Sequence, residues 1–571
     1  MNTSVENSYR DWCSRSLEDS ALTEELQDIS GKDDEINDRF YRDLQFGTGG
    51  LRGVLGAGTN RMNIYTVAKA TRGYAKYLLS KNEKPSVAIA YDSRINSTLF
   101  AQTAASVMAS CGVQVWIWPE LMPTPSLSFA VRYLHTSGGI VITASHNPAK
   151  YNGYKVYGPD GCQITTEAAA EIFASIRTVD IFKDYSPVKY EDGVKAENIR
   201  IIPEECFTSF IDAVSAQSLC GDGINKNVKI VYTPLYGTGL KCVTTCLKQN
   251  GFTDIETVKE QSHPDGNFPT CPYPNPEIRE ALEVGLKTAA EKNADLLIAT
   301  DPDCDRVGIA VRKGNDFQLL TGNEVGLLLL DYVCKRRMAL HKMPQDPVCV
   351  KTIVTSDLAC KIAENYGVQV IDVLTGFKFI GEQIGHLEAK GEEGRYIFGF
   401  EESYGYLTGS YVRDKDAVDG SLMIAEMFAF YRAEGKSLPD VLDGLYEKYG
   451  YCLNTLHSFE FDGESGFEKM QSIMKAFRTD VPEGFAGKKV LAVSDYETQV
   501  TREAGGKEEP IRGLPKSDVL KYRLEDGISV VVRPSGTEPK LKIYISTSAE
   551  NRNAAETLEK KITEEVGERL K

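Results

Sequence analysis

The sequence predicts a multidomain α/β protein with a smaller α+β domain at its C-terminal end. Apolar strand-like runs alternate with helix-like segments over three successive regions, up to about residue 450, and this alternation favours parallel sheets. In each region one strand-like run ends directly in a string of polar residues. From about residue 451 apolar and polar residues alternate with a period of two, beside only two helix-like stretches, which predicts an antiparallel sheet.

A chain of 571 residues is long enough for about four domains. The three α/β regions have similar spacing without similar residues, so we expect three related domains. The polar segment 221–227, GDGINKN, is predicted to be a linker. The expected domains are residues 1–220, 221–320, 321–450 and 451–571.

Individual elements are predicted from hydrophobic periodicity. Residues 8–44 have a helix-like pattern, and further helices are expected at 98–110, 465–477 and 549–570. Strands are expected at 86–91, 113–118, 139–142, 228–232, 294–300, 348–354, 368–373, 395–400 and 528–532.

The bulk composition excludes several classes of protein. A net charge of -16 argues against a nucleic-acid or anionic-membrane partner, because both are bound through basic surfaces. The 13 cysteines are scattered without zinc-ligand or disulfide spacing, as is typical of a reducing cytoplasm. We find neither a signal peptide nor an apolar run long enough to span a membrane. We therefore expect a cytoplasmic protein, and the sequence leaves a monomer and a homodimer open.

The stretch 138–157, GGIVITASHNPAKYNGYKVY, places a serine at the end of a predicted strand. Pro148 cannot continue a strand ladder, so Ser145 is expected on a loop, where open α/β sheets keep their chemistry. One interpretation is an ordinary Ser/Asn/Pro turn. The other is a nucleophilic or phosphorylated serine, with His146 and Lys155 supplying charge or proton transfer.

Three aspartates follow the predicted strand at 294–300, at alternate positions: Asp301, Asp303 and Asp305. An EF-hand calcium loop is excluded, because its glycine and glutamate positions hold Arg306 and Arg312. A solvated acidic turn is one interpretation. The other is a cation site, and ligands that are all oxygen favour Mg²⁺.

Three further strings are candidates for binding phosphate or sugar. The glycine-rich run 46–63 contains Arg52 and fits neither common phosphate fingerprint, so it is either a mobile loop or an arginine-based phosphate site. LTGFK (374–378) and GFEESYG (399–405) could present paired groups to sugar hydroxyls, or could be turn strings. RPSGTEPK (533–540) could form an anion-binding nest or a plain hairpin.

Together these strings resemble, in order and over nearly the whole chain, the α-D-phosphohexomutase superfamily of phosphoglucomutases and phosphomannomutases. The resemblance is strongest to the phosphoglucomutase and phosphopentomutase branch, through FGTGGLR and EESYGYLTGSY. It implies three similar mixed α/β domains around a central cleft plus a smaller C-terminal α+β domain. One departure is Phe400, which stands where many members have glycine.

The resemblance also assigns roles to individual residues. It implies a metal held by Ser145, Asp301, Asp303 and Asp305, and catalytic roles for Arg52, Ser145, His146, Lys155 and Lys415. It implies substrate-binding roles for Arg306, Thr375, Gly376, Phe377, Lys378, Glu401, Ser403, Arg533, Ser535, Gly536 and Thr537.

The function expected from this resemblance is interconversion of hexose 1-phosphate and hexose 6-phosphate, with glucose as the expected sugar. Phosphorylated Ser145 would give its phosphoryl group to the sugar, forming glucose 1,6-bisphosphate, and would then take the other one back. The expected cofactors are Mg²⁺ and glucose 1,6-bisphosphate. The alternatives are a phosphopentomutase, a phosphomannomutase, a glucose 1,6-bisphosphate synthase, a metal-dependent sugar phosphatase and a non-catalytic sugar-phosphate sensor.

Overall fold

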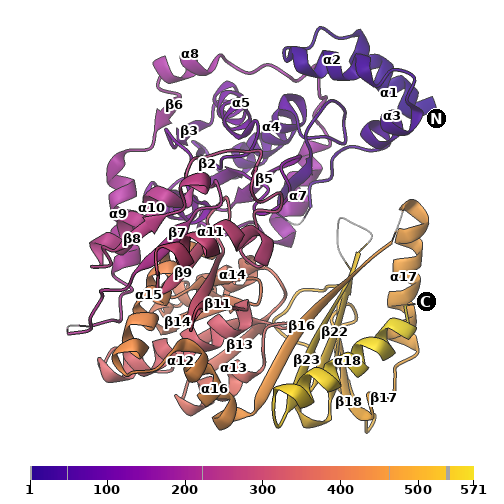
Figure 1. Cartoon of the computed structure of the whole chain (residues 1–571). Helices are drawn as coiled ribbons and strands as arrows, with labels where there is room; N and C mark the ends of the chain where they lie inside the picture. Colours follow the sequence, from indigo (N-terminus) through magenta and orange to yellow (C-terminus); the bar gives the residue numbers. More distant parts are fainter. Residues whose placement is uncertain (1–2, 48, 222, 462, 535–539, 571) are drawn as a thin grey trace. The chain divides into compact units, whose positions relative to one another are not determined.

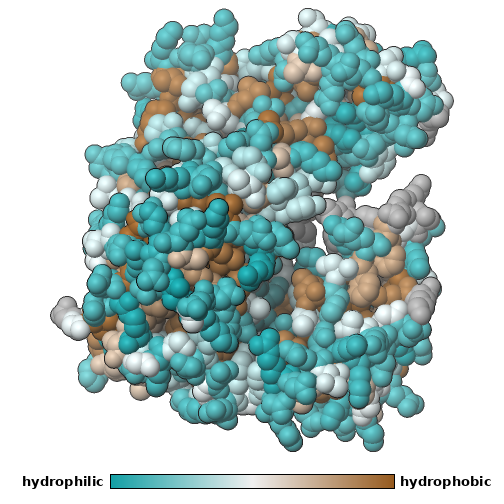
Figure 2. Space-filling view, in the orientation of Figure 1, coloured by the Kyte–Doolittle hydropathy of each residue, from teal (hydrophilic) through white to brown (hydrophobic). Residues whose placement is uncertain are grey.

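A computed structural model describes residues 3–47, 49–221, 223–461, 463–534 and 540–570 (Figure 1). The chain forms two compact units. The first contains Met1–Thr321, Phe377–Tyr396 and Ser403–Phe430, and the second contains Gly322–Gly376, Ile397–Glu402 and Tyr431–Lys571. Within the described ranges no helix is both long and apolar enough to cross a membrane. Hydrophilic residues cover most of the surface in the view of Figure 2.

The first sheet of the first unit has the strand order β1-β5-β4-β2-β3-β6. β2, β3, β4 and β6 run parallel, as the alternation of strands and helices predicts, whereas β5 is antiparallel to both of its neighbours, β4 and β1. The reason is local: only the loop 143–150 separates β4 from β5, and a short loop returns the chain antiparallel. Its strands are β1 (Gly50–Val54), β2 (Ser86–Tyr91), β3 (Gln114–Ile117), β4 (Gly138–Ile142), β5 (Tyr151–Tyr157) and β6 (Ile199–Ile201).

Helices and an aromatic cluster pack with this sheet. The helix-like N-terminal pattern is confirmed as three short helices, held by Trp12, whose ring contacts Phe40, Tyr65 and Phe182 edge-on. The helices are α1 (Thr3–Ser14), α2 (Ser20–Asp28), α3 (Asp33–Phe40), α4 (Ile64–Lys81), α5 (Ser97–Ser110), α6 (Thr124–Tyr133), α7 (Thr166–Ile176), α8 (Tyr190–Lys195) and α9 (Glu204–Ser215).

The second sheet of the first unit has the order β11-β10-β9-β7-β8. Its central strand β9 is buried along its whole length, as expected for a continuous apolar run, and the antiparallel strand β10 follows it directly. Its elements are β7 (Ile230–Thr233), α10 (Gly239–Gln249), β8 (Ile255–Thr257), the 3₁₀ helix η1 (Lys259–Gln261), α11 (Arg279–Glu291), β9 (Leu296–Thr300), β10 (Val307–Lys313) and β11 (Asp316–Leu320). Later segments add α14 (Phe377–Glu388), η2 (Glu393–Arg395), β15 (Gly405–Leu407) and most of α15 (Ala417–Ala433).

The second unit begins with a parallel pair of strands and continues into a separate antiparallel sheet. β12 and β13 pair in parallel, in the order β13-β12-β14. The elements of this part are α12 (Gly322–Ala339), β12 (Val348–Thr352), α13 (Leu358–Asn365), β13 (Gln369–Val373), β14 (Tyr396–Glu401) and α16 (Leu438–Tyr449).

The C-terminal sheet is antiparallel, with the order β16-β23-β22-β21-β18-β19-β20, and β17 pairs with β18. This confirms the period-two prediction, and α18 lies along the sheet in Figure 1. The elements are β16 (Tyr451–Glu460), α17 (Gly463–Thr479), β17 (Gly484–Phe485), β18 (Lys488–Asp495), β19 (Val500–Glu503), β20 (Glu508–Pro510), β21 (Leu520–Leu524), η3 (Glu525–Gly527), β22 (Ser529–Pro534), β23 (Lys540–Ala549) and α18 (Arg552–Glu568).

Candidate active site

The serine loop leaves the buried end of β4, where Ser145 is only 4% exposed. Its backbone is left-handed, with φ of 51°, a conformation that residues other than glycine adopt at a cost of about 1–2 kcal/mol. The Ser145 amide donates to Thr143 Oγ1 at 2.8 Å. The Ser145 hydroxyl donates to Asp301 Oδ2 at 2.7 Å and lies 3.1 Å from His146 Nδ1. Two distant polar strings therefore meet at one hydroxyl.

The aspartate string follows β9 and is entirely buried, which excludes the solvated acidic turn. One oxygen from each of Asp301, Asp303 and Asp305 lies within 4.8 Å of the other two. Burial and the two neighbouring carboxylates raise the pKa of Asp301 well above its usual range. Burial also opposes ionisation of Asp303, but the charges of Lys155 and Lys415 and the hydrogen bonds from Lys155 and Asp301 together outweigh it and hold the pKa of that carboxyl below its usual range.

Two lysines face this cluster, one from a strand and one from a loop. Lys155, on β5, donates to Asp303 Oδ2 at 2.8 Å and to Asp305 Oδ2 at 3.4 Å. Lys415 forms an ion pair with Asp305 Oδ2 at 2.8 Å. Burial disfavours the charged form of Lys155, but the carboxylates of Asp303 and Asp305 raise its pKa, so it remains an ammonium.

The cluster fits a divalent cation that prefers oxygen ligands. Within the described residues, Oδ1 of Asp303 and Oδ1 of Asp305 are buried and accept no hydrogen bond. Three buried carboxylates at this spacing repel one another, and a dication would relieve this repulsion and use the free oxygens. Asp301, Asp303, Asp305 and the hydroxyl of Ser145 are the groups that would hold it.

Cationic residues and a histidine surround the serine. Arg52, on β1, donates to the side-chain oxygen of Asn147 in the serine loop at 3.2 Å. Arg306 follows the aspartates and pairs with Glu277 at 2.5 Å. Burial, followed by the charges of Arg306 and Arg52, lowers the pKa of His146 well below its usual range. His146 is therefore uncharged at physiological pH.

Part of the predicted sugar site also lies in the first unit. Phe377 and Lys378 begin α14, and Ser403 is half-buried. Lys378 is 9% exposed, and burial lowers the pKa of its ammonium to about 8. The carbonyl of Lys378 accepts a hydrogen bond from the Cys162 thiol at 3.3 Å.

The other predicted sugar residues lie in the second unit. Glu401, 4% exposed at the end of β14, accepts a hydrogen bond from the Gly376 amide at 2.8 Å, so it shapes the neighbouring loop. Gly376 has φ of 121°, which favours glycine. Phe400 is fully buried and stacks on Phe398 with ring centroids 5.3 Å apart. The departure at Phe400 is thus a core residue rather than a change in a pocket wall.

The C-terminal phosphate string is only partly described. Arg533 is partly buried near the end of β22 and lies opposite Lys542 of β23. Ser535, Gly536 and Thr537 lie outside the described residues.

Several residues at the site were not predicted from the sequence. Arg94 contacts the serine loop, Thr124 donates to Asp303 Oδ2 at 2.9 Å, and Glu277 pairs with Arg306. Only Arg94 had a signal, because it belongs to a polar string directly after a strand, as do the aspartates. Gly237 also matters, since a Cβ there would lie 2.3 Å from the Cα of Pro302 in the aspartate string.

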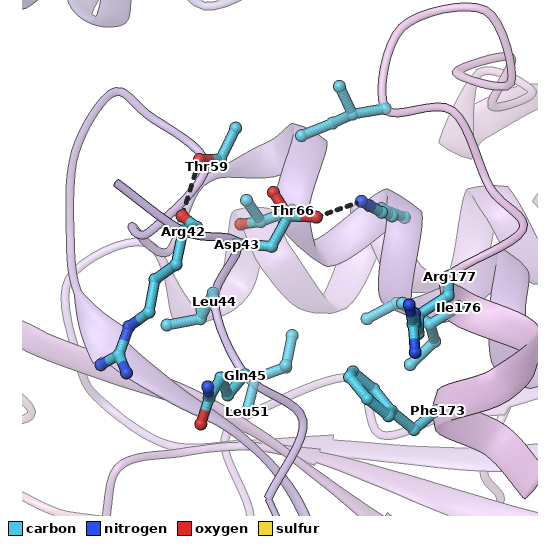
Figure 3. Close-up of a pocket in the computed structure, with 13 residues that line it drawn as sticks. Arg42, Asp43, Leu44, Gln45, Leu51, Thr59, Thr66, Phe173, Ile176 and Arg177 are labelled. Carbon is cyan, nitrogen blue, oxygen red and sulfur yellow. Dashed lines mark hydrogen bonds and ion pairs between the residues drawn. The ribbon is translucent and has the colours of Figure 1, made fainter. Parts of the chain in front are cut away.

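A separate cavity of about 250 Å³ lies elsewhere in the first unit, between the segment 42–45, α4 and α7 (Figure 3). Leu44, Leu51, Phe173 and Ile176 contribute apolar walls. None of the serine, aspartate, sugar or C-terminal phosphate strings lines it, although Leu51 and Thr59 of the glycine-rich run 46–63 do.

Comparison with known proteins supports one family over most of the chain. Four family models for phosphoglucomutase/phosphomannomutase match: α/β/α domain I at residues 43–181, domain II at 208–314, domain III at 321–449 and the C-terminal domain at 479–564. The phosphoglucomutase of Staphylococcus haemolyticus is 36% identical over 517 residues, covering 90% of this chain and 92% of that protein. That of Staphylococcus epidermidis is 38% identical over 510 residues, covering 89% and 91%.

Solved structures share the fold at lower identity. A phosphoglucomutase/phosphomannomutase family protein from Burkholderia thailandensis is 17% identical with a TM-score of 0.65, covering 92% of this chain and 97% of that one. The Paramecium phosphoglucomutase parafusin is 16% identical with a TM-score of 0.65, covering 93% and 94%. The predicted fold class, three similar α/β domains and a C-terminal domain, is confirmed by the four domain matches. Matches to all four domains, together with relatives aligned over nine-tenths of the sequence, place this chain in the phosphoglucomutase/phosphomannomutase family.

Proposed function

We propose that this protein is a phosphoglucomutase, which interconverts glucose 1-phosphate and glucose 6-phosphate through a phosphorylated serine. The observation that carries the proposal is the 2.7 Å contact between the hydroxyl of Ser145 and Asp301, within a buried trio of aspartates. A serine beside a dication site suits phosphoryl transfer, which depends mainly on positioning and charge neutralisation. A phosphate sensor would need neither group.

The reaction has two transfers. In the first, a free hydroxyl oxygen of the sugar attacks the phosphorus of phosphorylated Ser145; the new O–P bond forms as the bond to Ser145 Oγ breaks. The sugar hydroxyl loses its proton, Ser145 Oγ gains one as it leaves, and glucose 1,6-bisphosphate results. After the sugar has turned over, Ser145 Oγ loses its proton and attacks the other phosphorus; the new Oγ–P bond forms as the sugar O–P bond breaks, and the released sugar oxygen takes up a proton to become a free hydroxyl.

The charge of each site residue indicates its role in the two transfers. Mg²⁺ bound by Ser145 and the three aspartates would neutralise charge on the transferring group. Lys155 and Lys415 are cations beside the same carboxylates, so we assign them to binding phosphoryl oxygens. The imidazole Nδ1 of His146 lies 3.1 Å from Ser145 Oγ, and we propose on this geometry that it transfers the proton at that atom.

The remaining proposals concern substrate binding, the domains, the cellular compartment and the oligomeric state. We propose that Arg52 and Arg306 bind the reacting phosphate, that Thr375 to Lys378 with Glu401 and Ser403 bind the sugar, and that Arg533, Ser535, Gly536 and Thr537 hold the distal phosphate. Four functional domains, 1–220, 221–320, 321–450 and 451–571, would each supply one of these loops. All 13 cysteines are free, as suits a cytoplasmic enzyme, and we propose a monomer or homodimer there.

The test combines product analysis with detection of the phosphoserine. Wild-type protein with Mg²⁺ is given glucose 1-phosphate, with and without added glucose 1,6-bisphosphate, while glucose 6-phosphate and inorganic phosphate are measured. We expect glucose 6-phosphate without net release of phosphate, and a phosphorylated fraction that maps to Ser145 by mass spectrometry. Ser145→Ala should fold and lose turnover.

Each rival function gives a different result. Release of inorganic phosphate would indicate a phosphatase, and net synthesis of the bisphosphate from a separate donor would indicate a synthase. Higher catalytic efficiency on mannose or pentose 1-phosphates would change the assigned sugar. Full activity of Ser145→Ala would refute the mechanism.

A further inference from the structure

One buried arginine fixes the backbone of the serine loop. The side chain of Arg94 is fully buried, and its guanidinium donates to four main-chain carbonyls. Nη1 donates hydrogen bonds to the carbonyls of Pro148 and Tyr151, each at 3.0 Å, and Nη2 donates to those of Ser145 and Asn147. A guanidinium is planar and presents several donors in a fixed fork, so it holds these carbonyls in one arrangement.

Two neighbours, Asp92 and Phe268, hold Arg94 in place. Asp92 Oδ1 accepts hydrogen bonds from the Arg94 amide at 3.0 Å and from the Ser97 hydroxyl at 2.6 Å, and Asp92 Oδ2 lies 3.4 Å from Arg94 Nε. The ring of Phe268 lies against the guanidinium, 5.0 Å from the ring centroid to the central carbon. Burial lowers the pKa of Arg94, but an arginine stays charged in proteins. The structure thus keeps a cation in its interior whose donors point at a loop.

The position of this arginine matters because the conformation of Ser145 is strained. With φ of 51°, Ser145 must be held from both sides: its amide is fixed by Thr143 Oγ1, and its carbonyl is fixed by Arg94. This conformation aims the hydroxyl at Asp301, 2.7 Å away. If the carbonyl were released, the peptide could relax and the hydroxyl would turn away from the aspartates.

We propose that Arg94 is a positioning residue for the phosphoryl-carrying serine: by binding four carbonyls of its loop, it keeps Ser145 Oγ in line for both transfers. The proposal rests on the proposed mutase function, but it concerns a residue that touches neither sugar nor transferring phosphate. Its role is therefore visible in the rate of transfer and not in substrate binding.

The first experiment separates turnover from binding in Arg94→Ala. Misplacing a reacting group by about 1 Å lowers rates about 100-fold, so we expect kcat to fall by about that factor. The KM for glucose 1-phosphate should stay within about threefold, because the predicted substrate ligands are untouched. The rate at which glucose 1,6-bisphosphate phosphorylates Ser145, followed by intact mass in a single turnover, should fall by the same factor as kcat.

Chemical rescue then tests the fork directly. Removal of the side chain leaves a space beside Phe268 that is lined by carbonyls, and free guanidinium ion has the shape and donors to fill it. Guanidinium chloride, at concentrations below those that unfold the protein, should restore part of kcat in Arg94→Ala. Sodium chloride at equal concentration should not. Arg94→Lys keeps the charge but loses the planar fork, so we expect about a tenfold loss of kcat at unchanged KM.

Arg312 provides a matched control. It also donates to main-chain carbonyls, those of Ala294 at 2.7 Å and Ala289 at 3.3 Å, and it lies 4.8 Å from the ring centroid of Phe317. It makes no contact with the serine loop in the described part of the chain, so Arg312→Ala should keep kcat within about twofold.

The outcomes are distinct from those for the proposed function. If wild-type protein shows no mutase turnover, the proposed function fails, whatever Arg94 does. If wild type is active, wild-type kcat in Arg94→Lys or Arg94→Ala overturns the positioning role. So does a loss that appears only in KM, or an equal loss in Arg312→Ala. If Arg94→Ala does not fold, Arg94→Lys decides by the same comparison.

Discussion

The burial of Lys378 determines how strongly activity and stability should depend on pH. Its ammonium is buried near the N-terminus of α14, where the helix dipole also disfavours a positive charge. Burial lowers its pKa from 10.5 to about 8. If charged Lys378 binds the substrate, activity should depend on pH just above neutrality. The perturbation is Lys378→Arg, which restores a permanent charge.

The expected magnitude follows from the titration. With a pKa of about 8, Lys378 is charged in about 90% of molecules at pH 7 and in about 10% at pH 9. The kcat/KM of the wild type should therefore fall about ninefold over this interval, since kcat/KM reports the free enzyme. Arginine is charged throughout, so the variant should show no fall from this cause, even if its absolute activity is lower.

The lowered pKa of Lys378 also makes the stability of the folded protein rise with pH. The folded pKa lies below the unfolded value, so the charged lysine destabilises the folded state fully below about pH 8 and not at all above about pH 10.5. The wild type should thus gain stability as pH rises through this window. Lys378→Met should remove that gain, and at pH 7 it should be more stable by up to about 3 kcal/mol.

The assay measures kcat/KM for glucose 1-phosphate from pH 6 to pH 9.5 for wild type and Lys378→Arg, with melting temperatures of wild type and Lys378→Met at pH 7 and pH 9.5. Two results would refute the reasoning. One is a wild-type profile without a basic limb near pH 8. The other is an identical limb in the arginine variant, which would assign the titration to another group.

Three further predictions concern the metal, the distal phosphate and the packing of the aspartate string. Chelation should stop turnover and Mg²⁺ should restore it, and Asp303→Asn should need more Mg²⁺ for half-maximal activity because one anionic ligand is lost; full activity in excess chelator would contradict this. Arg533→Ala should lower kcat/KM about 30-fold to 150-fold, the equivalent of about 2 to 3 kcal/mol, by a similar factor on glucose and pentose 1-phosphates; a defect confined to one sugar would assign Arg533 to sugar selection. Gly237→Ala should displace Pro302, lower the melting temperature and weaken activation by Mg²⁺. A wild-type melting temperature and wild-type Mg²⁺ activation would show that the aspartate loop tolerates the added methyl group.

The sequence predicted individual elements well where one local rule was sufficient. β2 has the bounds expected from its run of small apolar and β-branched residues, and β9 is buried along its length as a continuous apolar run should be. The parallel character of the first sheet was predicted incompletely, because strand and helix alternation does not register the short return from β4 to β5. That return matters for function, since it brings Lys155 to the aspartates.

What the sequence determined by itself is the chemistry available: a serine in a turn-forming string, three alternating aspartates and several phosphate-suited arginines, each placed at the end of a strand by local periodicity. What only the tertiary structure decided is which of them meet. Ser145 and Asp301 follow strands of two different sheets, and their 2.7 Å contact depends on the packing of these sheets, which no local pattern encodes. The left-handed backbone of Ser145 likewise has no sequence signal, because serine does not favour it. It is held by the carbonyl contacts of Arg94, and such strain persists only where surrounding groups fix it.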